Sequence, residues 1–239
     1  MSRLYVVATP LGNSKDITLR ALEVLKKVKV ILCEDTRVTQ KLLRILEIDT
    51  KDKKLLPYFE HNERAKIKDV VSLLSLGYDI ALVSDAGTPL VSDPGYPLVN
   101  YIQNLSIKER ENIQIEVLPG PSSVLTALVY SGFATDKFTF LGYIPRKPND
   151  RKKLFQQVRK SYEHIKSTYI CFENLNRLEI SLESMLLILG EKVEVCLCRE
   201  LTKLHEEIVK ADLKDMLAKI HAKEINLKGE LVIVFRFKY

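Results

Sequence analysis

The stretch IALVSDAGTPLVSDPG, residues 80–95, places a strand-like apolar run, Ile80–Ser84, directly before a loop rich in glycine, proline and aspartate. An apolar run without alternation is typical of a strand in a parallel sheet that helices cover on both faces. Two glycines, two prolines and two aspartates follow within residues 84–95. They restrict the backbone to a tight path that can bring amides and carbonyls close to a ligand. The stretch therefore predicts a buried strand that ends in a binding loop.

The chain around this stretch alternates short apolar runs with amphipathic helical patterns. The other strand-like runs are Leu4–Thr9, Val30–Cys33, Leu55–Phe59 and Ile115–Leu118, and the helical patterns are Thr18–Val28, Thr36–Leu46, Asn62–Leu76 and Pro97–Gln103. Such a βαβ series predicts an N-terminal α/β domain with a doubly wound parallel sheet.

Pro119-Gly120-Pro121 interrupts the series, and Ser122 is placed to cap a new helix that runs to about Tyr130. We therefore predict two α/β domains, residues 1–118 and 119–239. The second has a looser pattern that predicts a mixed sheet: strands at Phe138–Leu141, Thr168–Phe172, Val193–Cys198 and Glu230–Lys238, helices to about Ile165 and over Leu178–Leu189 and Leu213–Ile220, and a charged segment before the last helix.

The composition is that of a soluble globular protein, because 46% of the 239 residues are hydrophobic and 28% are charged. No apolar run approaches the roughly 18 residues of a membrane helix. The strand-like run at Leu4–Thr9 begins so close to Met1 that no secretory leader is expected. We expect a cytoplasmic protein without a membrane partner.

The cysteines indicate neither disulfides nor a metal site. All four lie inside strand-like runs and none shows a CxxC spacing: Cys33, Cys171, Cys196 and Cys198. Buried, reduced thiols are the expected state, and no zinc or other metal site is predicted.

The net charge of +6 is concentrated in one segment, Asp136–Lys166, which holds nine basic and three acidic residues. Five aromatic residues are interleaved with these charges: Phe138, Phe140, Tyr143, Phe155 and Tyr162. Basic and aromatic side chains together are typical of RNA-binding surfaces. The alternative is a set of core aromatics beneath a solvated helix face. The cluster as a whole favours RNA, whereas each aromatic by itself favours the core.

Polar residues follow four of the predicted strands, at the edge of the sheet where ligands of doubly wound folds bind. They are Thr9-Pro10, Glu34-Asp35-Thr36-Arg37, Glu60-His61-Asn62-Glu63 and Ser84-Asp85-Ala86-Gly87-Thr88-Pro89. The alternative for Asp35, Thr36, Asn62 and Asp85 is that they cap helices or turns. Neither GxGxxG nor GxxxxGK[ST] occurs, so an ordinary Rossmann or P-loop nucleotide site is disfavoured.

These strings resemble, in the same order and over essentially the whole chain, the blocks of a known family. The blocks are Ala8–Asn13, Asp16–Thr18, Glu34–Arg37, His61–Glu63, Ser84–Gly95, Leu118–Pro121, Arg199–Lys203 and Lys228–Glu230. The resemblance is to the class III, tetrapyrrole-methylase-like family of S-adenosylmethionine methyltransferases, and within it to the branch called ribosomal RNA small subunit methyltransferase I.

The resemblance implies 2′-O-methylation of a cytidine in the decoding region of 16S rRNA, with S-adenosylmethionine bound in a cleft between the two domains of a homodimer. It also implies which residues bind the cofactor: Thr9, Pro10, Asp85, Gly87, Thr88, Pro89, Leu90, Ser122, Ser123, Gly229 and Glu230. Ser122 and Ser123 have helix capping as their alternative role, although a helix N-terminus can also bind a carboxylate.

Removal of the proton from a ribose hydroxyl needs a carboxylate or histidine, helped by a nearby cation. The candidates are Glu34, Asp35, His61, and Glu200 together with Lys203, and the sequence does not choose among them. Glu200 has an ion pair with Arg199 or Lys203 as its alternative role.

Longer members of the branch continue past the last strand into a small helical tail, whereas this chain stops at Tyr239. We therefore expect the RNA contacts to come from the basic segment Asp136–Lys166. The predicted RNA-binding residues are Arg37, Arg146, Lys147, Arg151, Lys152 and Lys153. Two rival functions stay open. A small-molecule, tetrapyrrole-type methylase leaves the basic segment unexplained, and a non-catalytic RNA-binding protein leaves the polar strand ends unexplained.

Overall fold

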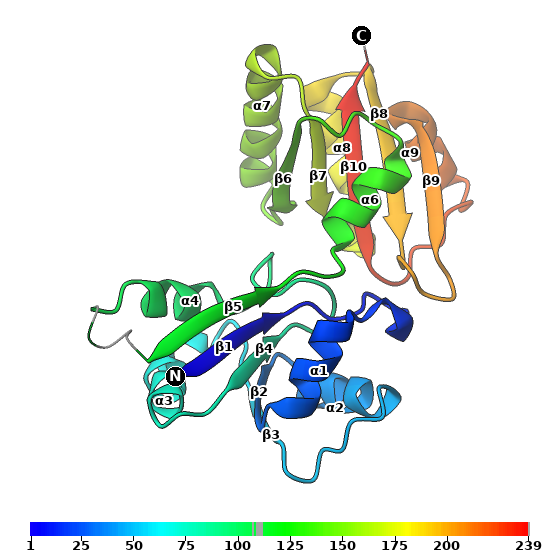
Figure 1. Cartoon of the computed structure of the whole chain (residues 1–239). Coiled ribbons are helices and arrows are strands. Elements are labelled where there is room, and N and C mark those ends of the chain that lie inside the picture. Colours follow the sequence, from blue (N-terminus) through cyan, green and yellow to red (C-terminus); the bar gives the residue numbers. More distant parts are fainter. Residues whose placement is uncertain (107, 109–111, 239) are drawn as a thin grey trace. The chain divides into compact units, whose positions relative to one another are not determined.

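The computed structural model describes residues 1–106, 108 and 112–238, and the chain divides into two compact units, Met1–Ser122 and Ser123–Tyr239 (Figure 1). Each unit has its own five-stranded sheet and its own hydrophobic core. The predicted fold class, two α/β domains with a parallel and a mixed sheet, is confirmed.

The sheet of the first unit has the order β3-β2-β4-β1-β5, and all of its neighbouring strands are parallel. Its strands are β1 (Ser2–Val7), β2 (Val30–Cys33), β3 (Lys54–Pro57), β4 (Ile80–Val83) and β5 (Ile113–Leu118). Every residue of β2 and β4 is buried, which is why these runs contain no polar alternation.

Among the described residues of this unit, four α-helices cover the two faces of the sheet. They are α1 (Leu19–Lys27), α2 (Thr36–Ile45), α3 (Glu63–Ser75) and α4 (Tyr96–Gln103), and a short 3-10 helix, η1 (Ser14–Asp16), precedes α1. Leu25 of α1 and Leu43 of α2 share a core with Val7 of β1. Leu74 of α3 and Leu98 of α4 belong to a separate core on the other face. The carboxyl ends of all five strands therefore lie at one edge, where the polar loops begin.

The second unit has a mixed sheet of order β6-β7-β10-β8-β9. Its strands are β6 (Phe138–Tyr143), β7 (Thr168–Phe172), β8 (Val193–Arg199), β9 (Glu207–Asp212) and β10 (Leu231–Phe237), and its helices are α6 (Ser123–Ser131), α7 (Pro148–His164), η2 (Leu175–Arg177), α8 (Leu178–Leu189) and α9 (Leu213–His221). Residues of α7, α8 and α9 build one large core with one face of the sheet, and α6 packs against β10, β8 and β7.

The edge strand of this unit differs from the sequence-based expectation. The sequence predicts only a charged segment before α9, whereas β9 is a strand that pairs antiparallel with β8 along its whole length. The strand lies at the sheet edge, and its Glu207, Lys210 and Asp212 give it no apolar run. Pairing with the buried β8, rather than its own side chains, makes it a strand.

The cysteines lie where the sequence places them. Cys33, Cys171, Cys196 and Cys198 are all buried and free of disulfides. Among the helices that the structure describes, none is long and apolar enough to cross a membrane.

Candidate functional site

Two loops at the carboxyl edge of the first sheet are joined by backbone hydrogen bonds. Thr9 N–H donates to the Gly87 carbonyl (2.8 Å), and Gly87 N–H donates to the Thr9 carbonyl (3.0 Å). The buried Thr9 hydroxyl also donates to the Ser84 carbonyl at 3.1 Å. Gly87 has a φ of 81°, a conformation that glycine adopts without strain. The loops after β1 and β4 therefore form one rigid surface.

The loop after β5 belongs to the same surface. The Thr88 hydroxyl donates to the Pro121 carbonyl at 2.9 Å. A side chain on Gly120 would bring its Cβ to 2.9 Å from the Cβ of Ala8, so only glycine lets the two loops approach this closely. Three neighbouring strands, β4, β1 and β5, thus end in loops that are bonded to one another.

The second half of the loop after β4 has a strained backbone. Leu90 and Ser92 have φ values of 72° and 65°, and Gly95 has a φ of 128°. The Gly95 N–H donates to Oε2 of Glu63 at 2.8 Å, and Glu63 is buried. Glu63 thereby holds the end of the strained loop. This residue belongs to one of the polar strings but is not among the predicted site residues, because nothing in a sequence distinguishes a buried carboxylate from an exposed one.

Acidic side chains gather where β2 and β4 end. The Asp35 N–H donates to Oδ1 of Asp85 at 3.1 Å. Glu34, one residue earlier, is half-buried. Burial raises the pKa of the Glu34 carboxyl above its ordinary value, and the negative charges of Asp85, Asp35 and Glu60 raise it further. This edge is therefore a negatively charged environment that favours a cation.

Asp35 has a structural role. Its carboxylate caps α2 by accepting the Arg37 N–H at 2.8 Å, and it pairs with the Arg37 guanidinium at 2.6 Å. The bonds from the Arg37 side chain and backbone lower the pKa of Asp35 to about 2. The capping interpretation is confirmed for this residue. His61, in contrast, is exposed at the surface.

In the second unit, three predicted site residues, Glu200, Lys203 and Glu230, form one hydrogen-bonded group, and a fourth, Gly229, lies against it. Glu200 Oε1 accepts from the Glu230 N–H (2.9 Å) and from Lys203 Nζ (3.0 Å), and Lys203 also pairs with the Glu230 carboxylate at 3.0 Å. Gly229 has a φ of 100°, and a Cβ there would lie 2.5 Å from Cδ of Glu200. Glycine at this position leaves room for the carboxylate.

The charges of this group are fixed by its contacts. Burial by itself raises the pKa of Glu200, but the hydrogen bonds from Glu230 and Lys203 outweigh it, so the pKa of the carboxyl is lowered. Burial likewise lowers the pKa of Lys203, but its bonds to Glu230 and Glu200 raise it overall. Glu200 therefore stays ionised and Lys203 stays protonated near neutral pH.

Comparison with known proteins decides the family. A family model described as Tetrapyrrole (Corrin/Porphyrin) Methylases matches residues 3–217. The chain is 43% identical over 232 residues to Ribosomal RNA small subunit methyltransferase I of Hydrogenobaculum sp. (strain Y04AAS1), which covers 97% of this chain and 94% of that protein. It is 39% identical over 238 residues to the protein of the same name from Thermotoga maritima, which covers 100% of both chains. The chain belongs to the ribosomal RNA small subunit methyltransferase I family.

Solved structures agree with the fold of this methyltransferase family. The methyltransferase CobJ superposes with a TM-score of 0.72 at 15% identity, covering 99% of this chain and 95% of its own. Uroporphyrin-III C-methyltransferase from Thermus thermophilus, complexed with S-adenyl homocysteine, superposes with a TM-score of 0.62 at 16% identity over 98% and 97% of the two chains. At these identities the likeness concerns the fold alone.

The basic segment of this family member divides into exposed and buried residues. Arg146, Lys147, Lys152 and Lys153 are exposed. Arg151 is only 3% exposed, and its guanidinium donates to the Ser184 hydroxyl at 3.0 Å and to the Arg146 carbonyl at 3.3 Å. The expectation that Arg151 contacts RNA is therefore wrong, since its side chain ties α7 to α8 and to the loop before α7.

The aromatic residues of the segment divide in the same way. Phe155 is fully buried, and Tyr162 stacks on Phe237 with ring centroids 4.2 Å apart, as the core interpretation predicts. Phe138 and Tyr143 are 41% and 60% exposed.

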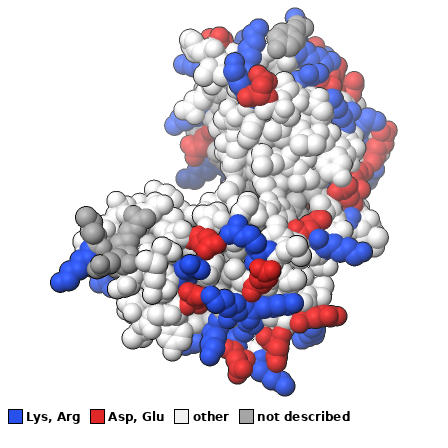
Figure 2. All heavy atoms as spheres, viewed as in Figure 1, with Lys and Arg blue, Asp and Glu red and all other residues white. Residues whose placement is uncertain are grey.

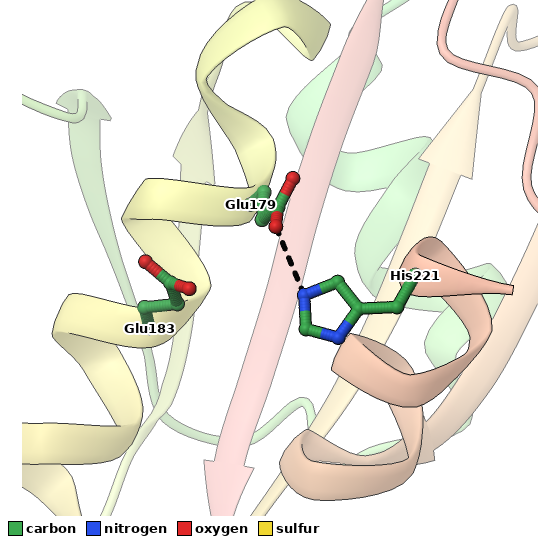
Figure 3. Close-up of side chains that lie close together, drawn as sticks. All are labelled: Glu179, Glu183 and His221. Carbon is green, nitrogen blue, oxygen red and sulfur yellow. Dashed lines mark hydrogen bonds and ion pairs between the residues drawn. The ribbon is translucent and has the colours of Figure 1, made fainter. Parts of the chain in front are cut away.

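One group of side chains among the described residues has donor atoms close enough for a metal ion. Glu179 and Glu183 lie one turn apart on α8 and face His221 at the end of α9 (Figure 3). His221 Nε2 lies 2.9 Å from Oε1 of Glu179. All three side chains are exposed, and surface groups of this kind are common without a metal, so we assign none to it.

Proposed function

We propose that this chain transfers a methyl group from S-adenosylmethionine to the 2′-hydroxyl of a cytidine in the decoding region of 16S rRNA, in the small ribosomal subunit. The observation that carries the proposal is the 39% identity, over the whole of both chains, to a ribosomal RNA small subunit methyltransferase I. The bonded loops at the carboxyl edge of the first sheet support it, because doubly wound folds bind their ligands there.

The loops after β1, β4 and β5 hold the cofactor in this proposal. S-adenosylmethionine carries a sulfonium and an ammonium group, and the Asp85 carboxylate suits a cation of this kind. The glycine conformation at Gly87 lets the backbone approach the ligand. The proposed cofactor residues are those that the family resemblance implies: Thr9, Pro10, Asp85, Gly87, Thr88, Pro89, Leu90, Ser122, Ser123, Gly229 and Glu230.

Glu34 is the proton acceptor in this proposal. Bound S-adenosylmethionine supplies the methyl group and leaves as S-adenosylhomocysteine once the C–S bond breaks and the O–C bond forms. The hydroxyl proton passes to the Glu34 carboxylate, whose raised pKa brings it nearer to that of a useful base. The other two candidate carboxylates suit this role less well, because Asp35 is paired with Arg37 and Glu200 already accepts two hydrogen bonds.

Lys203 has a supporting role. Because two carboxylates keep its ammonium charged, it is suited to stabilising negative charge that develops on the ribose oxygen. His61 remains the competing base, and a His61→Gln variant that loses methyl transfer while Glu34→Gln keeps it would reverse the assignment.

RNA phosphates bind the exposed lysines and arginines of the basic segment in this proposal: Arg146, Lys147, Lys152 and Lys153, together with Arg37. Each lost phosphate contact should flatten the plot of log affinity against log salt by roughly 0.7 to 0.9.

The working protein is a cytoplasmic homodimer in this proposal, and light scattering should then give twice the chain mass of 27.4 kDa. A stable mass equal to one chain contradicts the dimer.

The test is methyl transfer from labelled S-adenosylmethionine to three substrates: small ribosomal subunits from cells lacking this modification, protein-free 16S rRNA, and a corrin precursor. Label in the subunits, mapped by nuclease digestion and mass spectrometry to a ribose of the decoding region, is the expected result. Label only in the corrin precursor refutes the proposal, as does RNA binding without transfer. Label on a base rather than a ribose refutes the 2′-hydroxyl as the acceptor.

A further inference from the structure

Strand β6 has a bulge that reverses the direction of one aromatic side chain. Phe140 pairs with Ile170 and Tyr143 pairs with Phe172, so the register shifts by one residue between these pairs. Gly142, inside the shift, has a φ of 69°. Side chains alternate between the faces of a strand, and an extra residue moves every later side chain to the other face. Tyr143 therefore joins Phe140 instead of pointing toward the core that α7 and α8 build.

Four aromatic residues lie on this face of the sheet, and we call them the aromatic face: Phe138, Phe140, Tyr143 and Phe172. The rings of Phe140 and Phe172 meet edge to face with centroids 5.0 Å apart, and those of Tyr143 and Phe172 do so at 5.3 Å. These contacts hold Tyr143 in place, yet the residue is 60% exposed. A rigid ring with this exposure has the properties of a stacking surface.

The helix on this side of the sheet, α6, packs against β10, β8 and β7 and lies away from the edge strand β6. Figure 1 shows α6 lying across β10 and β8, with β6 beyond it at the edge of the sheet. Phe138 of β6 is accordingly 41% exposed. Large aromatic side chains grouped at the surface indicate a binding site more often than scattered ones do.

Charge indicates what this site binds. Residues 137–149, which contain β6 and the loop after it, hold three basic residues and no acidic one: Lys137, Arg146 and Lys147. All three are exposed. Figure 2 shows the corresponding face of the second unit as largely uncharged, with Lys and Arg side chains along the side that carries α7. An aromatic surface with cations beside it suits a single strand of nucleic acid, whose bases stack while its phosphates pair with the cations.

We infer that the aromatic face binds unpaired bases of the RNA substrate, with Tyr143 as the stacking residue and with Arg146 and Lys147 on the neighbouring phosphates. This inference rests on the proposed function and adds the form of RNA that the second unit recognises. Duplex RNA cannot use the site, because its bases are already stacked and paired.

The test compares two RNA probes, a single-stranded oligopyrimidine and a blunt duplex of the same length, by fluorescence anisotropy with the full chain. Tyr143→Ala should weaken binding of the single strand by about 5- to 150-fold, since stacking contributes about 1–3 kcal/mol per base. Tyr143→Trp should restore it. Duplex binding and the salt slope should stay as in the parent, because no phosphate contact is lost. Tyr78→Ala, which removes a tyrosine that is 45% exposed in the first unit, is the matched control and should bind as the parent does.

Equal affinity of the parent and Tyr143→Ala for the single strand overturns the inference, and so does an equal loss for the duplex. If Tyr143→Ala does not fold, Phe138→Ala takes its place with the same expectations. If Tyr143→Ala or Phe138→Ala keeps RNA binding but has a different mass from the parent in light scattering, a second copy of the chain covers this face. That result also overturns the inference. The proposed function is tested separately, because methyl transfer by the parent protein to small ribosomal subunits does not depend on the result for Tyr143.

Discussion

Replacing Gly229 with alanine should disrupt the group that Glu200 forms with Lys203 and Glu230. The new Cβ would lie 2.5 Å from Cδ and Oε1 of Glu200, so the carboxylate must move. A positive φ costs a residue with a side chain about 1–2 kcal/mol. Loss of the hydrogen bond from Glu230 to a charged acceptor costs about 1.5–3 kcal/mol, toward the lower end here because the Glu200 side chain is 18% exposed. The expected total is about 2.5–4 kcal/mol.

Calorimetry should show this loss in the unfolding transition of the second unit. For a unit of this size, 1 kcal/mol corresponds to about 4 °C, so the second unit of Gly229→Ala should unfold at a temperature about 10–16 °C lower. Gly190→Ala is the matched control in the same unit. Gly190 also has a positive φ, 88°, but among the described residues no atom beyond its chain neighbours lies within 4 Å of the place that a Cβ would take. Only the backbone cost of about 1–2 kcal/mol therefore applies to the control.

A second comparison isolates the clash. In a Glu200→Ala background the obstructing carboxylate is gone, and Gly229→Ala should cost no more than Gly190→Ala does. The two substitutions should therefore be strongly non-additive, as expected for residues in direct contact. If Gly229→Ala and Gly190→Ala destabilise the unit equally, or if the Glu200 and Gly229 effects simply add, the reasoning about this contact is refuted.

Three further substitutions test other parts of the structure. Glu34→Gln should abolish methyl transfer. Because the folded-state pKa of Glu34 is raised above 4.5, ionisation of this carboxyl opposes folding of the parent, so the difference in unfolding temperature between variant and parent should favour the variant more at pH 8 than at pH 4. The same difference at both pH values would contradict this. Thr88→Val removes the hydroxyl that donates to the Pro121 carbonyl, and titration calorimetry should show weaker S-adenosylmethionine binding, whereas Thr50→Val should match the parent. Arg151→Ala should lower the free energy of unfolding by about 1.5–3 kcal/mol, against less than about 0.5 for the exposed Lys152→Ala, and equal effects would argue against the buried role of Arg151.

The sequence predicts most of the fold because buried parallel strands and amphipathic helices carry strong patterns. Val30–Cys33 and Thr168–Phe172 are predicted with the bounds that the structure shows. β9 is missed because an edge strand needs no apolar run, and its neighbour β8 supplies the pairing. The pattern of apolar side chains therefore predicts the buried strands and helices, and it misses an edge strand that only backbone hydrogen bonds to its neighbour stabilise.

The site is predicted less completely, for a different reason. Sequence strings indicate which loops lie at the carboxyl edge, but the roles within them depend on burial and contact. Arg151 and Lys152 are adjacent basic residues of one helix, yet one is buried and the other exposed. Asp35 and Glu34 are adjacent carboxylates with pKa values shifted in opposite directions, because only Asp35 has an arginine partner. Such differences arise from the three-dimensional neighbours of each residue.

The strand orders of the two sheets have a consequence for synthesis of the chain. β1 pairs with β4 and β5, so the first strand made has no partner in its sheet until much of the first unit has left the ribosome. β10 lies between β7 and β8, so the second sheet stays divided until its last strand emerges. Because units generally fold in the order of their synthesis, the first unit can complete its sheet before the second begins to close. Ribosome-bound chains stalled just after Val234 should therefore contain a protease-resistant first unit and a protease-sensitive second one.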